Sequence, residues 1–181
     1  MIKLKEEVMV SDPCYSVGTW CQHKLKNVLP GEYKAFVLQI QEYGTRTSVL
    51  QVIHKDYLGK ELTWRKASDQ IGVDSGQCGI FSIESYRNDD IEIERPELAG
   101  GFNINHDEPG DSWYESMCHF TLGDKRWGEY SEGVVSSSGF GDGQYVCKVA
   151  KVDKKIVGIT LDFGIHNKLD NFLLNNIQRI K

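Results

Sequence analysis

The residues with the clearest chemical potential are four aspartates that stand beside turn-forming residues: Asp12, Asp74, Asp142 and Asp162. Carboxylate oxygens are the ligands that Ca²⁺ and Mg²⁺ prefer, so two to four of these side chains meeting in space would form a metal site. A pair of them could also act as acid and base. The alternative is that each aspartate bonds the backbone N–H groups of its own tight turn.

A serine- and glycine-rich loop offers a second kind of site. Its glycines allow positive φ and a close approach of the backbone to a ligand. The loop could hold a phosphate or carboxylate in a nest of backbone N–H groups, or it could be a tight connection between strands. It is not a P-loop, because the lysine-serine/threonine ending is absent and a strand follows. The candidate ligand-binding residues are Ser136, Ser137, Ser138, Gly139, Gly141, Asp142, Gly143, Asp74 and Ser75.

The sequence contains no recognisable group of residues for nucleophilic catalysis. Cys118 and His119 are adjacent, but neighbouring helical positions point in different directions, so these two side chains are not expected to pair. The five histidines lack metal-ligand spacing. Gly139 and Gly141 flank a phenylalanine, which excludes a G-x-S-x-G nucleophile elbow. No catalytic residue is therefore assigned.

Composition limits the partners that this chain of 181 residues can have. Its formal net charge of -5 provides no global positive field, which argues against a nucleic-acid partner. No apolar run is long enough to span a bilayer, and the N-terminus does not have the pattern of a signal peptide. The odd number of cysteines, without a C-x-x-C pair, predicts reduced, packed thiols in a cytoplasmic protein.

The elements that must position these residues are mostly short strands. Alternating or β-branched segments separated by turn signals predict a mainly β fold: a single antiparallel β-sandwich-like domain over residues 1–181 with one or two helices. Ser112 and Glu115 have capping-box spacing at the start of a helix whose inward stripe is Trp113, Met117 and Phe120. Weaker helical patterns cover residues 20–28 and 169–180.

Several islands of the sequence resemble an uncharacterised family of bacterial and phage domains. The stretch Gly139–Tyr145 reads G-F-G-D-G-Q-Y, and an aspartate-phenylalanine pair follows at Asp162. Asp74-Ser75-Gly76 and Ser11-Asp12-Pro13 resemble two further elements, and Pro30-Gly31-x-Tyr33 a third. The resemblance implies a shared β-rich fold and no particular reaction.

Together these patterns predict a non-catalytic binding domain for a small polar ligand or a protein partner. The bacterial and phage setting of the resemblance would suit an accessory, immunity or anti-defence role. The alternative hypothesis is a hydrolase, assisted by Ca²⁺ or Mg²⁺ held by clustered aspartates. The two hypotheses differ in one observation, whether those carboxylates converge in a cleft.

Overall fold

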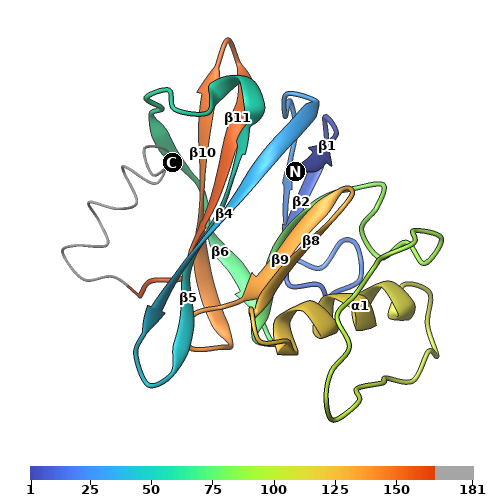
Figure 1. Cartoon of the computed structure of the whole chain (residues 1–181). Helices are drawn as coiled ribbons and strands as arrows, with labels where there is room; N and C mark the ends of the chain where they lie inside the picture. Colours follow the sequence, from blue (N-terminus) through green and yellow to red (C-terminus); the bar gives the residue numbers. More distant parts are fainter. Residues whose placement is uncertain (166–181) are drawn as a thin grey trace.

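The computed structural model describes residues 1–165, which form two antiparallel sheets packed face to face (Figure 1). The larger sheet has the strand order β1-β4-β5-β11-β10-β6, and the smaller one has the order β3-β2-β7-β9-β8. The strands are β1 (Ile2–Leu4), β2 (Val8–Ser11), β3 (His23–Leu25), β4 (Gly31–Gln41), β5 (Thr45–His54), β6 (Trp64–Val73), β7 (Gln77–Ser82), β8 (Trp127–Tyr130), β9 (Gly133–Ser137), β10 (Gly143–Val152) and β11 (Lys155–Asp162). The prediction of an antiparallel β-sandwich is confirmed.

The main core lies between the two sheets. Val8, Val10 and Ile80 from the smaller sheet pack in one cluster with Leu50 and Ile159 from the larger one, and all five are fully buried. Alternation along β2 sends Met9 to the opposite face of the smaller sheet. Residues on both faces of the smaller sheet are therefore buried, which predicts a further layer outside that sheet.

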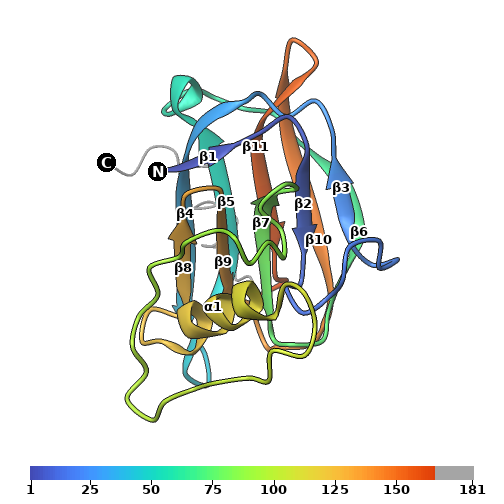
Figure 2. The same ribbon diagram turned by 90° about the vertical axis from the view of Figure 1, so that its right-hand side faces the viewer.

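That outer layer is helix α1 (Asp111–Leu122), which lies against β8 and β9 (Figure 2). Its predicted inward stripe of Trp113, Met117 and Phe120 is confirmed, because all three are buried against Phe81 and its neighbours. The ring of Trp113 lies at 73° to that of Phe81 with the centroids 5.1 Å apart, an edge-to-face contact that favours aromatic pairs. The helix therefore packs through its aromatic face, and its other face is free to contact a loop.

The start of α1 corrects the capping-box prediction. Ser112 makes no side-chain cap, and the cap position is occupied by Gly110 with φ of 91°. The capping oxygens come from Asp89 instead, which accepts hydrogen bonds from the backbone N–H groups of Gly110 at 2.7 Å and Trp113 at 2.9 Å. A carboxylate at this end also complements the helix dipole. Glu115, which the motif assigned to the cap, is used elsewhere.

We expect Asp89→Ala to lower the free energy of unfolding by about 1–2 kcal/mol, the usual effect of losing a capping side chain. Urea unfolding followed by circular dichroism measures the difference. Asp90→Ala is the matched control, because Asp90 is an exposed neighbour and the capping oxygens belong to Asp89. Equal stability of the two variants would contradict the assigned cap.

The expected helix over residues 20–28 is wrong. Its centre forms β3, which pairs antiparallel with β2 through Val8 opposite Leu25, and Trp20 is 77 % exposed instead of inward. Pairing with β2 outweighs the loose helical spacing, because it gives the backbone groups of β3 hydrogen-bond partners and also buries Leu25. The helical pattern at 169–180 lies outside the described residues.

Candidate functional site

Three of the four predicted aspartates, Asp12, Asp74 and Asp142, lie at the end of the sandwich where the chain changes sheets. Residues 74–76 carry the chain from β6 in the larger sheet to β7 in the smaller one, and residues 138–142 carry it back from β9 to β10. Asp12 follows β2 at the same end and is fully buried. Its Oδ2 accepts hydrogen bonds from the backbone N–H groups of Asp74 at 2.8 Å and Ser75 at 2.7 Å.

The second carboxylate oxygen of Asp12 also accepts two hydrogen bonds. Oδ1 accepts from the Ser75 hydroxyl at 2.6 Å and from the Cys14 backbone N–H at 2.8 Å. Asp142 extends the arrangement, because its Oδ1 accepts from the Gly76 N–H at 3.1 Å. Asp12 therefore bonds a turn more than sixty residues away as well as its own, which sequence reasoning did not foresee. We call Asp12, the 74–76 turn and Asp142 the crossover latch.

The serine- and glycine-rich loop has its polar groups largely directed inward. The backbone N–H groups of Ser138, Gly139 and Gly141 donate to the carbonyls of Gly76, Thr47 and Ser138 at 2.9, 3.1 and 2.6 Å. The Ser138 hydroxyl donates to Gly141 O, whereas Gly143 begins β10. These three amides are consequently engaged within the protein and do not form an open nest.

The two remaining serines lie on β9 and not in the loop. The Ser137 Oγ is 3.1 Å from the Thr47 Oγ1. Ser136 is fully buried, and within residues 1–165 its hydroxyl has no hydrogen-bond partner. The candidate ligand-binding residues are thus brought together at one end of the sandwich, but most of their donors and acceptors bond one another. Their role in holding a ligand stays a prediction.

The carboxylate geometry does not favour a metal site. The four hydrogens around Asp12 point at both its oxygens, where a cation would meet positive dipoles instead of free lone pairs. Asp162 is engaged elsewhere, with Lys148 Nζ at 2.8 Å and the Gly164 N–H at 3.0 Å. Among residues 1–165, no three side chains of His, Cys, Asp or Glu are grouped to hold a metal ion.

Cys118 and His119 lie on α1 but serve separate functions in the structure. Burial raises the pKa of the Cys118 thiol, and the hydrogen bond from the Gln77 amide at 3.3 Å opposes this only partly. The two ring nitrogens of His119 lie 2.9 Å from Pro96 O and 3.0 Å from Phe102 O. Cys118 is thus a buried, protonated thiol, and His119 contacts the loop before the helix.

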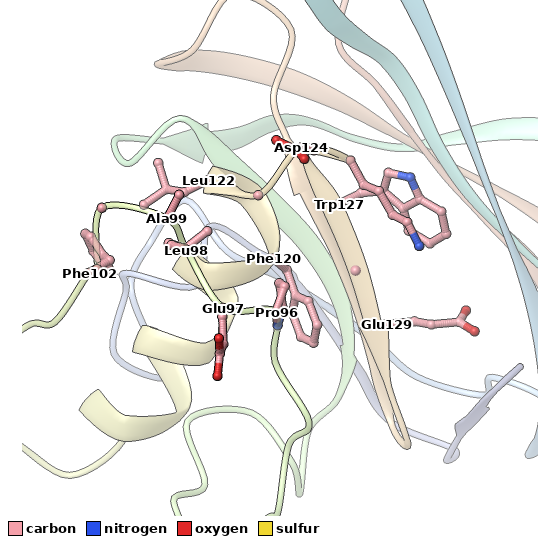
Figure 3. Close-up of a pocket in the computed structure, with 15 residues that line it drawn as sticks. Pro96, Glu97, Leu98, Ala99, Phe102, Phe120, Leu122, Asp124, Trp127 and Glu129 are labelled. Carbon is pink, nitrogen blue, oxygen red and sulfur yellow. The ribbon is translucent and has the colours of Figure 1, made fainter.

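That long loop, residues 83–110, forms one wall of a pocket of about 860 Å³ beside β8 (Figure 3). Figure 3 shows Leu98 and Leu122 on one side, Trp127 on the strand at the other side, and Phe120 between them. The acidic side chains of the lining are Glu97, Asp124 and Glu129, and its single cation is Lys125. The pocket combines an apolar wall with a net negative rim.

Two helix residues hold the pocket's loop in place. Glu115 is 2 % exposed; its Oε1 is 2.9 Å from Arg95 Nη2, and its Oε2 is 2.5 Å from His106 Nε2. His119, one turn further along α1, reaches the loop carbonyls of Pro96 and Phe102. Glu115 Oε1 lies 3.6 Å from His119 Nε2, so these two helix residues also face each other.

The charges around Glu115 determine its protonation state. Burial alone would raise the pKa of the Glu115 carboxyl, but the hydrogen bond from His106 and the charge of Arg95 outweigh it and lower that pKa below its ordinary value. Glu115 is therefore an anion at neutral pH. The loop is fastened at Arg95, Pro96, Phe102 and His106 by side chains spaced four residues apart on one helix face.

Sequence reasoning missed this pocket, although one signal was present. A connection of this length without regular structure is uncommon in a compact domain and is usually functional or disordered. The spacing of Glu115 and His119 on α1 was also visible. What the sequence did not show is that both side chains face the preceding loop.

Comparisons with known proteins returned no relative. No protein-family model matches the chain, and neither a curated protein nor a solved structure matches it. The resemblance to a bacterial and phage family stays a prediction. The helical segments of residues 1–165 fall short of the length and hydrophobicity that a bilayer crossing requires.

Proposed function

We propose that this protein is a non-catalytic binding domain that captures an extended segment of a protein partner at the pocket beside β8. The observation that carries the proposal is the place of the pocket: a cavity of about 860 Å³ with an apolar wall lies against the outermost strand of the smaller sheet. An edge strand offers backbone donors and acceptors to an incoming strand, and a neighbouring pocket selects its side chains.

The chemistry of the lining defines the segment. Phe120, Leu122 and Trp127 would receive one large apolar side chain, whose burial supplies most of the affinity. The acidic residues Glu97 and Asp124 at the rim favour lysine or arginine in the same segment. A protein that acts by capturing another protein suits the accessory or immunity role that the resemblance implies. The geometry of the aspartates gives the hydrolase alternative no support.

The test is a selection of random displayed peptides on the immobilised full chain, followed by affinity measurement. We expect peptides with a large apolar residue next to a basic one. Leu122→Asp should weaken their binding at least about 30-fold, because it places a charge on the apolar wall at the centre of the contact. Leu122 is already 59 % exposed, so the fold should tolerate the change.

Val17→Asp is the matched control, since Val17 is an aliphatic side chain of similar exposure (62 %) that does not line the pocket. Its affinity for the selected peptides should equal that of the wild type. Peptides that bind the Leu122→Asp variant as tightly as the wild type would refute the proposal. So would a selection that enriches no peptide while a small apolar compound raises the melting temperature.

A further inference from the structure

A second groove, of about 610 Å³, lies at the other side of the sandwich from β8. There β3, the outermost strand of the smaller sheet, faces β6, the outermost strand of the larger one (Figure 2). Two backbone hydrogen bonds lie next to it: Gly72 N–H, in β6, donates to Cys21 O at 3.1 Å, and Ile156 N–H, in β11, donates to Asn27 O at 2.9 Å. The groove is an opening in the side of the sandwich.

The groove has an apolar floor and cationic walls. Leu25, Val149 and Ile156 belong to the main core cluster and form the floor. No aspartate or glutamate lines the groove. On a chain whose formal net charge is -5, the cations gathered here are Lys24, Lys26, Arg65, Lys66 and Lys151.

Two of these five cations have partners outside the groove. Lys24 pairs with Glu7 at 2.5 Å, and Lys66 pairs with Asp69 at 2.7 Å. Within residues 1–165, the other three, Lys26, Arg65 and Lys151, form no ion pair. Three positive charges around one opening repel one another, although Glu7 attracts Lys26 from outside the groove. A multivalent anion between them would relieve that repulsion.

We propose that the groove between β3 and β6 binds a small phosphate-bearing molecule, with its phosphate on Lys26, Arg65 and Lys151 and its apolar body on the floor. Arginine offers a planar fork for two phosphate oxygens, and the lysines act as point charges. A phosphate group carries more negative charge than a single carboxylate, which suits three cations. The volume lies within the range of small-molecule sites.

Two alternative roles for the cations of the groove are less well supported. A nucleic-acid strand would need a positive surface along its backbone, but the formal net charge of -5 provides no global positive field. Lysines also protect sheet edges against pairing with another chain, a role that requires neither a floor nor a cavity. A cavity with an apolar base therefore favours a small ligand.

The test is calorimetric titration of the full chain with ATP, adenosine and inorganic phosphate at about 50 mM salt, where charge contacts are weakly screened. We expect ATP to bind, inorganic phosphate to bind at least about tenfold more weakly because it lacks the apolar body, and adenosine not to bind. Reversing the three charges, as Lys26→Glu, Arg65→Glu and Lys151→Glu together, should weaken ATP at least about 30-fold.

The matched control reverses three exposed lysines outside the groove, as Lys34→Glu, Lys60→Glu and Lys154→Glu together, and changes the net charge equally. It should leave ATP affinity within about threefold of the wild type. If the first triple variant does not fold, the single change Lys151→Ala should still weaken ATP about tenfold. An unchanged affinity in that variant would overturn the proposal.

Three further results would also overturn it. One is the absence of any heat of binding with ATP at about 1 mM. Self-association of the triple variant in that case would indicate that these cations protect the sheet edges against pairing with another chain. Another is equal weakening in both triple variants, which would reduce the effect to net charge. The third is tighter binding of a single-stranded oligonucleotide than of ATP, which would indicate a nucleic-acid surface instead.

Discussion

Asp12→Asn is expected to lower the free energy of unfolding by about 3 kcal/mol, because it replaces a buried acceptor oxygen by an NH₂ group facing N–H or O–H donors. Both oxygens of Asp12 accept two hydrogen bonds each, so neither orientation of the asparagine amide restores the set. The lost bonds release the 74–76 turn, and with it the connection between the two sheets. Urea unfolding of both proteins measures the change.

Asp90→Asn is the matched control for charge, since Asp90 is exposed, and we expect its stability to lie within about 0.5 kcal/mol of the wild type. Hydrogen exchange measures the local effect: the backbone amides of Asp74 and Ser75 should exchange faster in the Asp12→Asn variant. If Asp12→Asn were as stable as the control, the crossover latch would not be a stabilising feature.

Glu115→Gln should have two effects, a loss of about 2 kcal/mol in stability and at least about tenfold weaker binding of the selected peptides. The variant leaves Arg95 without its anion, and the loop that forms the pocket wall loses its central anchor. The expected loss is smaller than for a fully buried pair because the side chains of Arg95 and His106 are 34 % and 50 % exposed. Thermal unfolding and peptide titration measure the two effects.

The pH dependence identifies Glu115 as the cause. Its folded-state pKa is lowered, so its contribution to stability is complete above the ordinary value of 4.5 and is lost as the pH falls through the folded-state pKa. The wild type should show this acid-dependent loss, and the glutamine variant should lack it. Glu94→Gln, at an exposed site of the same loop, should behave as the wild type. The same acid profile in both variants would contradict the assignment.

The strands and their turns could be predicted from the sequence because their signals are local. Alternating and β-branched segments between turn signals predicted the antiparallel sandwich, and the serine- and glycine-rich loop lies at the corner before β10. Asp74-Ser75-Gly76 was also singled out, as an element of the family resemblance. Its function as a crossover between sheets was not predicted, because the sheet to which a strand belongs depends on pairings distant in sequence.

The candidate site likewise depends on contacts between residues that are distant in sequence. Asp12 and Asp142 both accept hydrogen bonds from backbone N–H groups of the 74–76 turn, whereas the alternative read from the sequence was that each aspartate bonds only its own turn. Sequence spacing carries no information on such a contact. The pocket was missed because its walls come from a loop, a helix and an edge strand, and only the packing of α1 on β8 brings Phe120 and Trp127 together.

In the proposed complex, a partner segment adds to β8 and fills the pocket beside it. Hydrogen–deuterium exchange of the full chain, with and without a selected peptide, tests this most directly. We predict slower exchange in two places, the backbone of Trp127–Tyr130 and the loop at residues 96–102. A bound peptide that leaves exchange at β8 and in this loop unchanged would contradict the account.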